Sequence, residues 1–269
     1  AGQAYTFELT TLLSTDQNTL NNTYSLVKTI ENPSAPIVSG IQCSGLSELT
    51  LTATSGTPLW YNSDNALVGS GLNIKVPSNS KYSASYNDFS GGIGPKTKSE
   101  FGGGTYYGSF GPTVIVEAKV PIILESARIY VGTAGRITFD VINKETGNIV
   151  SSITKTVKAS RTLSSGGSTG QLVDDKKDEG LVVNLNLQIP IAGTYYLSQT
   201  CLDGASIYRS NRSKSDTINA PINIGFPYAI PNILNIPGAL FNNGVITSGF
   251  YYFYDMKFKS LGCPSPRAN

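Results

Sequence analysis

Hydrophobic and polar residues alternate in short runs along the whole chain, and glycine, proline, asparagine and serine separate the runs. No window of ten or more residues keeps the i, i+3, i+4, i+7 apolar spacing of an amphipathic helix. Alternation with a period of two predicts half-buried β-strands, and closely spaced turn residues are typical of sandwiches and barrels. The pattern therefore predicts an all-β protein.

The first part of the chain predicts a hairpin and then a set of short strands. Residues 4–9 alternate, and residues 23–30 are their expected partner. Two strands alone are only marginally stable in water, so we expect this hairpin to pack on another element. A stiff linker follows at 32–36, because proline fixes φ and biases its predecessor toward extended backbone. Further strands are predicted at 49–53, 58–61, 72–76 and 81–86.

A glycine-rich connector over 87–107 leads into a longer series of strands. These are predicted at 113–117, 122–131, 136–143, 149–157, 181–189, from 193, 206–209 and 250–258. About eight strands over some 150 residues suit a two-sheet jelly roll. In the last strand, alternation predicts that about half of the side chains from Tyr251 to Tyr254 face outward or into an interface.

Composition narrows the chemistry. The chain of 269 residues has 20 Lys and Arg against 18 Asp and Glu, a net charge of +2, and it has no histidine. The missing histidine excludes Ser-His-Asp and Cys-His nucleophile systems, His-ligated zinc and facial-triad iron. The balanced charge argues against nucleic acid as a partner. No apolar run approaches the length that spans a membrane, so we expect no membrane insertion.

The acidic residues indicate neither a catalytic pair nor an EF-hand. Glycosidases use two carboxylates across a cleft, but no local pattern brings together the candidates Asp140, Glu145, Asp203 and Asp255. Asp174, Asp175, Asp178 and Glu179 form an acidic run in the polar segment 159–179. This run is expected to be a solvated loop, because two lysines interrupt it and the alternating EF-hand ligands are missing. We therefore expect no enzyme, no metal centre and no cofactor, while a structural calcium ion held by carbonyl groups stays open.

Three cysteines, Cys43, Cys201 and Cys263, are too far apart for a CxxC metal or redox motif. One bridge and one spare thiol are the natural arrangement in an oxidising compartment. Low charge and abundant serine, threonine, asparagine, glycine and tyrosine fit an extracellular β protein. Cys201 is interpreted as a buried free thiol.

Several segments of the first part resemble a bacterial immunoglobulin-like (Ig-like) module. They are the run from Cys43 to Ala53, then 59–62, 67–71 and 81–82. Such modules recur in large surface and secreted proteins of Gram-negative bacteria that use type IX secretion. In that family a cysteine before the second strand pairs with one in a Gly-Cys-x-Ser-x-Arg segment, which resembles 262–267 here. The resemblance implies a Cys43–Cys263 disulfide, worth roughly 4–5 kcal/mol in the chain-entropy model, with two independent buried thiols as the alternative.

The late second cysteine implies that the longer strand series is inserted into the Ig-like module. The insert resembles a companion domain of such proteins at 102–107, 136–140, 207–211, 226–228 and the aromatic strand that runs to Asp255. The implied fold is an Ig-like β-sandwich interrupted by a jelly-roll-type β-sandwich. Its expected parts are 1–32, terminal strands of a preceding β-sandwich repeat; 33–86 with 261–269, the Ig-like domain without its final strand; and 87–260, the inserted domain.

The best ligand-binding candidates are Tyr208, Arg209, Asn211 and Arg212, with Tyr228 nearby in the chain. Tyrosine stacks on sugar faces, and arginine and asparagine hydrogen-bond hydroxyls or carboxylates. A surface loop without a ligand is the alternative. Trp60 is expected in the core of the Ig-like module, as in other sandwiches.

Two functions fit this sequence best. The first is a non-catalytic structural or adhesion segment of a large exported protein at the outer surface of a Gram-negative bacterium, with neighbouring repeats of the same polypeptide and host or cell-surface proteins as partners. The second is a carbohydrate-binding accessory module of a secreted polysaccharide-degrading enzyme, with surface glycans as partners. A hydrolase that uses two carboxylates is the least supported.

Overall fold

The computed structural model describes residues 2–12, 15, 17–41, 45, 47–100, 103–109, 111–164, 167–168, 170–210, 225–247 and 249–269. These residues form an all-β structure of antiparallel sheets, which confirms the predicted fold class. In this part of the chain the helical elements are two short 3-10 turns, η1 (Thr19–Asn21) and η2 (Lys98–Glu100). No helix among the described residues is long and apolar enough to cross a membrane.

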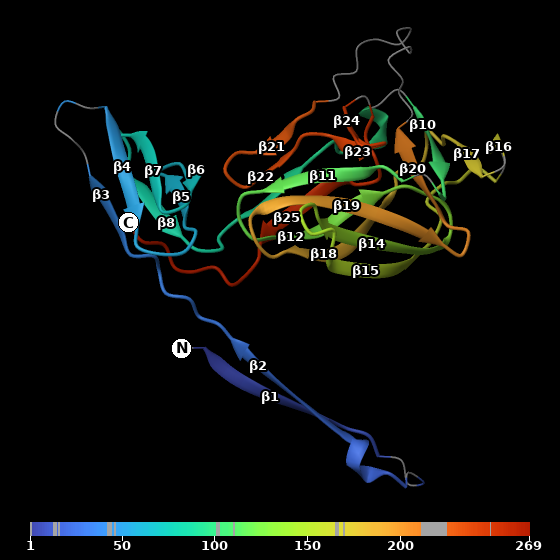
Figure 1. The fold of residues 1–269 in the computed structure, drawn as a ribbon, viewed down its shortest axis with the longest axis horizontal. Coiled ribbons are helices and arrows are strands. Elements are labelled where there is room, and N and C mark those ends of the chain that lie inside the picture. The colour runs from blue at the N-terminus through green and yellow to red at the C-terminus, as the bar shows by residue number, and fades with distance from the viewer. Residues whose placement is uncertain are drawn as a thin grey trace.

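The predicted hairpin is confirmed, but it packs on nothing within the described chain. Strands β1 (Gln3–Thr10) and β2 (Thr23–Ile30) pair in antiparallel register, with Phe7 opposite Leu26. They form a separate two-stranded sheet that extends away from the rest of the molecule (Figure 1). Every position of both strands is exposed, so the expected packing partner is not found among the described residues.

Six short strands then form a smaller sandwich, defined here as β3 to β8. One sheet contains β3 (Val38–Ile41), β4 (Glu48–Ala53) and β7 (Asn73–Pro77), and the other contains β6 (Leu67–Ser70), β5 (Leu59–Asn62) and β8 (Tyr82–Ser85). The two sheets share a core around Trp60, which is almost fully buried. The indole Nε1 of Trp60 donates to the carbonyl oxygen of Gly71 at 2.8 Å, so the polar atom of this ring is satisfied inside the core. The expected core position of Trp60 is confirmed.

The remaining strands form the larger sandwich, β9 to β25. Its largest sheet contains β15 (Ile149–Val157), β14 (Gly135–Asn143), β19 (Gly193–Leu202), β11 (Thr113–Ala118), β22 (Leu234–Ile236) and β21 (Tyr228–Ile230), with β23 (Ala239–Phe241) and β24 (Gly244–Ile246) attached through β11. A second sheet contains β18 (Leu181–Ile189), β12 (Ile122–Ile129), β25 (Tyr254–Ser260) and β9 (Ser90–Ile93). A third contains β13 (Val131–Thr133), β20 (Ser206–Ser210), β10 (Gly104–Tyr107), β17 (Gln171–Val173) and β16 (Gly167–Ser168). Alternating apolar residues of these strands point into one extended core.

The chain leaves the larger sandwich beside the point where it enters. Strand β9, the first of the larger sandwich, pairs with β25, the last. The C-terminal segment then returns to the smaller sandwich (Figure 1). There Ala268 forms a β-bridge with Ala84. Ser265 Oγ accepts from the backbone N–H of Tyr86 at 2.9 Å, and the Arg267 guanidinium pairs with Asp88 at 2.9 Å.

The aromatic run before β25 does not alternate as the sequence predicts. Tyr251, Tyr252, Phe253 and Tyr254 are all buried. Tyr252 has a φ of 66°, in the left-handed region, and the N–H of Phe253 donates to the carbonyl of Tyr251 at 2.8 Å. The backbone therefore turns here instead of extending, and the regular strand begins only at Tyr254. The expectation that half of these side chains face outward was wrong, because the period of two needs continuous extended backbone.

Candidate functional site

The residues predicted to bind a ligand are not gathered on one exposed face. Tyr208, on β20, has only 1% of its surface exposed, and its ring lies edge-on to Tyr106 with 5.3 Å between centroids. Burial raises the pKa of Tyr208 well above its usual value. In this position the ring has no exposed face on which a sugar could stack.

The other predicted residues have different surroundings. The Arg209 guanidinium carbon lies 5.9 Å from the centroid of the Tyr107 ring. Tyr228 is half-buried against Phe226, with 5.0 Å between ring centroids, and burial raises its pKa to about 12. Asn211 and Arg212 lie outside the described residues.

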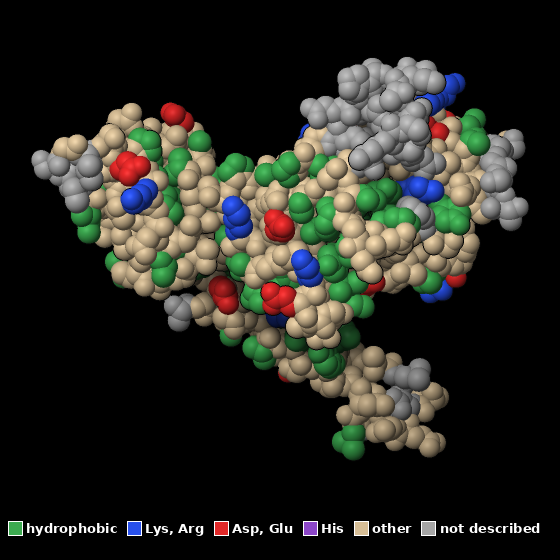
Figure 2. Space-filling view, turned by 45° about the horizontal axis from the view of Figure 1, so that its top comes forward, with side chains coloured by type: hydrophobic (Ala, Val, Ile, Leu, Met, Phe, Trp, Pro, Cys, Tyr) green, Lys and Arg blue, Asp and Glu red, His purple; other side chains and the backbone are tan. Residues whose placement is uncertain are grey.

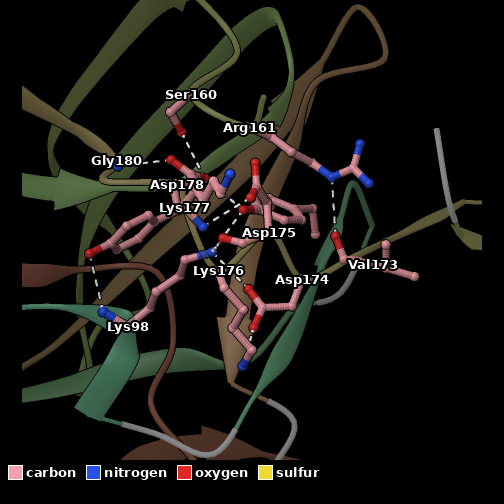
Figure 3. A network of polar contacts seen from close by, with 12 residues as sticks. Lys98, Ser160, Arg161, Val173, Asp174, Asp175, Lys176, Lys177, Asp178 and Gly180 are labelled. Carbon is pink, nitrogen blue, oxygen red and sulfur yellow. Dashed lines mark hydrogen bonds and ion pairs between the residues drawn. The ribbon is translucent and has the colours of Figure 1, made fainter. Parts of the chain in front are cut away.

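A buried lysine, not noticed in the sequence, is the centre of a polar network in the larger sandwich. Lys98 begins the η2 turn, which the Glu100 carboxylate caps by accepting from the backbone N–H of Thr97 at 3.1 Å. The Lys98 residue is only 5% exposed. Its Nζ donates to Tyr106 Oη at 2.9 Å, to Asp174 Oδ1 at 2.7 Å and to the carbonyl of Asp175 at 2.6 Å (Figure 3). All three protons of the ammonium therefore have acceptors, as a buried charge requires.

Three tyrosine rings surround the same ammonium. The centroids of Tyr208, Tyr106 and Tyr130 lie 4.6, 5.1 and 5.2 Å from Lys98 Nζ. Rings at this distance attract a cation, and the attraction is stronger where water is excluded. The hydroxyl of Tyr106 also donates to Asp178 Oδ2 at 2.6 Å. Burial and this neighbouring carboxylate raise the pKa of Tyr106 far above its ordinary value, so the hydroxyl keeps its proton.

The acidic run 174–179 is only in part the solvated loop that the sequence predicts, because Glu179 and the two lysines are exposed whereas two of its carboxylates are buried. Asp175 and Asp178 are 2% and 5% exposed, and each carboxylate accepts several hydrogen bonds. Asp178 accepts from Ser160 Oγ at 3.1 Å and from the N–H of Gly180 at 2.8 Å, in addition to Tyr106 (Figure 3). The prediction was wrong for Asp175 and Asp178 because it treated the acidic run as a local feature, whereas several of their hydrogen-bond donors, Tyr106, Ser160 and Thr162, come from other segments.

Asp175 gives this network a defined response to pH. Its Oδ2 accepts from the hydroxyl and the N–H of Thr162, both at 2.7 Å, and these bonds lower the pKa of Asp175 from 3.8 to about 2. A carboxyl whose pKa is lower when folded stabilises the fold above its unfolded pKa and loses that contribution as the pH falls through the folded value. We therefore expect this contribution to disappear between about pH 4 and about pH 2.

The test compares Asp175→Asn with the wild type in urea denaturation at pH 5, 4 and 3. The variant should be less stable at pH 5, and the difference should narrow as the pH falls, because asparagine does not titrate. Asp64→Asn, which alters an exposed carboxylate of the smaller sandwich, is the control. A difference that stays constant with pH would contradict the assignment.

A pocket of about 700 Å³ opens beside the network. This volume lies in the usual range for small-ligand sites. Its walls come from the η2 turn, the end of β12 and the loop that follows β17. The lining residues are Thr97, Lys98, Ser99, Arg128, Tyr130, Asp174, Lys176, Lys177, Asp178 and Glu179.

The remaining predictions concern the cysteines and a metal centre. Cys43 lies outside the described residues, so its pairing with Cys263 stays a prediction. The two described cysteines, Cys201 and Cys263, form no disulfide with each other. Cys201 is half-buried, and burial raises the pKa of its thiol to about 11. In the described part of the chain, no group of three or more Asp, Glu or Cys side chains is placed to hold a metal ion.

Lys98 and Arg128 were not among the site residues predicted from the sequence. Lys98 gives no local signal, since its partners Asp174 and Asp175 lie 76 and 77 residues away in the chain. Arg128 does give one, because it is a lone cation near the end of a strand whose other positions are largely apolar. No known protein family, curated protein or solved structure matches this chain.

Proposed function

We propose that this chain is a non-catalytic structural or adhesion segment of a large exported protein at the outer surface of a Gram-negative bacterium. The observation that supports this most is the path of the chain, which enters and leaves the larger sandwich at paired strands β9 and β25. The C-terminal segment is then fastened to the smaller sandwich through Ser265, Arg267 and Ala268. A domain held at one end in this way presents its far surfaces to a partner.

The hairpin supports a further part of this proposal, namely contact with a neighbouring repeat of the same polypeptide. Opposed residues of an antiparallel pair share a face, and the register places six of the seven large apolar side chains of the two strands on one face, with Val27 on the other. That face contains Tyr5, Phe7, Leu9, Tyr24, Leu26 and Ile30. All six are exposed, Leu9 to 67%, and hydrophobic side chains are visible along the hairpin (Figure 2). A two-stranded ribbon with such a face needs a second sheet to be stable.

Hydrogen exchange tests the hairpin. We expect the amides of β1 and β2 to exchange fast in this chain alone, and to be protected at least tenfold when the chain is produced together with the neighbouring repeat. Phe7→Ser should remove the protection, whereas Thr6→Ser, on the opposite polar face, should not. Equal exchange with and without the neighbouring repeat would contradict this part of the proposal.

Binding without turnover tests the main function. The full chain is applied to arrays of extracellular and cell-surface proteins and of glycans, and sugar release is measured on any polysaccharide that it binds. We expect binding to a surface protein and no released sugar. Hydrolysis of a polysaccharide by the purified chain would overturn the non-catalytic assignment.

The second candidate, a carbohydrate-binding accessory module, is favoured by the pocket beside Lys98. The pocket has the volume of a small-ligand site and carries hydroxyl, carboxylate and cationic groups, which are the groups that hydrogen-bond sugars. Micromolar binding to one polysaccharide, together with no protein partner on the arrays, would favour this candidate over the first.

A further inference from the structure

Arg128 lies in the wall of this pocket, and only part of the hydrogen-bond donors of its guanidinium have acceptors in the described part of the chain. It lies on β12, between β18 and β25, opposite Val182 and Tyr254. Its Nη1 donates to the carbonyl oxygen of Glu179 at 2.6 Å. The Nε atom is buried and has no acceptor among the described residues. A buried donor without an acceptor is energetically unfavourable, so the hydrogen-bonding capacity of this guanidinium is not fully used by the described residues.

Two of the cations that line the pocket are available to a ligand. The lining has four cations and three carboxylates. Asp174 is shared by Lys98 and Lys176, with 2.7 and 2.8 Å between the paired atoms. The Asp178 carboxylate already accepts hydrogen bonds from Tyr106, Ser160 and Gly180.

The remaining carboxylate of the lining belongs to Glu179, which is exposed. Within the described residues, neither Arg128 nor Lys177 forms an ion pair. The pocket therefore keeps two cations that have no carboxylate partner of their own.

The rest of the lining suits a ligand rich in hydroxyl groups. The hydroxyls of Thr97 and Ser99 lie 2.6 Å apart at the η2 turn, and both residues line the pocket. Hydroxyls can donate and accept, so they can exchange their mutual bond for bonds to a sugar. The volume of about 700 Å³ is large enough for one or two sugar units.

We propose that this pocket binds an acidic sugar unit, with the carboxylate of the ligand held by the guanidinium edge of Arg128 and supported by Lys177. Arginine binds carboxylates through two parallel N–H donors, which fixes both orientation and charge. A neutral sugar offers no carboxylate to that edge, so Arg128 selects the charge of the ligand and the hydroxyls of Thr97 and Ser99 contact its ring. This proposal rests on the second candidate function and specifies its ligand class.

Calorimetric titration of the full chain tests the proposal. The probes are three acidic disaccharides, of galacturonate, of mannuronate and of hyaluronan, each compared with its methyl ester and with neutral galactobiose. We expect at least one acid to bind and its ester to bind at least tenfold more weakly. Arg128→Gln should weaken binding of the acid at least tenfold, and Lys177→Gln, which alters an exposed side chain, should weaken it several-fold. Arg136→Gln, which alters an exposed arginine paired with Asp203 away from the pocket, should leave binding unchanged.

The outcomes separate the ligand class from the function. Equal binding of acid and ester, or full binding by both the Arg128 and Lys177 variants, would overturn the proposal. Tight binding of galactobiose alone would also overturn it but keep the carbohydrate-binding function. Binding of no sugar at millimolar concentration would overturn both. Since Lys177 is exposed, its variant gives a result even where the Arg128 variant is unstable.

Discussion

Replacing Lys98 with methionine should lower the free energy of unfolding of the larger sandwich by about 3–5 kcal/mol, the usual cost of removing one partner of a buried ion pair. Methionine fills much of the same space but donates no hydrogen bond. The variant therefore leaves Asp174 without its buried partner and the carbonyl of Asp175 without its donor. It also removes the cation that the three tyrosine rings surround.

Two spectroscopic probes separate the effect by domain. Trp60 is the only tryptophan of the chain and lies in the smaller sandwich, so its fluorescence reports the unfolding of that part. All buried tyrosines except Tyr61 belong to the larger sandwich, so near-ultraviolet circular dichroism of the tyrosines chiefly reports that part. We expect the tyrosine transition to move to lower urea concentration and the Trp60 transition to move less.

Lys96→Met is the matched control for Lys98. Lys96 also pairs with an aspartate, Asp255, at 3.0 Å, but its side chain is 63% exposed. Exposed pairs contribute about 0–1 kcal/mol, so this variant should behave almost like the wild type. Equal transitions for Lys98→Met and Lys96→Met would show that the buried network does not stabilise the fold.

Tyr252→Ala and Phe253→Ala should each destabilise the larger sandwich by about 3–5 kcal/mol, the range for removing a large aromatic side chain from a core. Both residues are fully buried, and the rings of Phe253 and Phe139 lie edge-to-face with centroids 5.8 Å apart. The urea transition of the tyrosine circular dichroism measures both variants.

The pair of substitutions decides between two conformations of this segment. In a continuous strand the two neighbours would point to opposite faces, and one substitution would be tolerated. Because Tyr252 adopts a positive φ, both side chains reach the core and both substitutions should be severe. Tyr24→Ala, on the exposed hairpin, is the control and should change little in this chain. A mild effect of Tyr252→Ala would favour the regular strand.

Much of the strand content could be predicted because the pattern that specifies it is local. The alternation over 136–143, 149–157 and 181–189 predicted β14, β15 and β18 to within a residue at each end. A half-buried strand imposes its period of two on each side chain in turn, whatever the rest of the chain does. The same rule failed at Tyr252, where one left-handed residue resets the period.

The site could not be predicted, since it depends on the register between distant segments. Nothing near Lys98 in the sequence marks it as buried, and nothing near Asp178 names Tyr106 as its donor, 72 residues away. The prediction of a solvated acidic loop followed the ordinary preference of charged residues for water, which holds unless partners are supplied. Tyr208 was predicted to bind a sugar because it lies in an apparently polar segment. This segment lies on β20, whose neighbouring strands bury the ring.

The β-bridge between Ala84 and Ala268 has a mechanical consequence. If the chain is stretched between its two ends, tension passes from the linker into the smaller sandwich, along β8 and across this bridge to the C-terminal residues. The larger sandwich, which is attached as a side branch at β9 and β25, stays outside that path as long as the bridge holds. Its pocket therefore keeps its geometry while the polypeptide on either side is under load, and extension of the larger sandwich can begin only after Ala268 has detached.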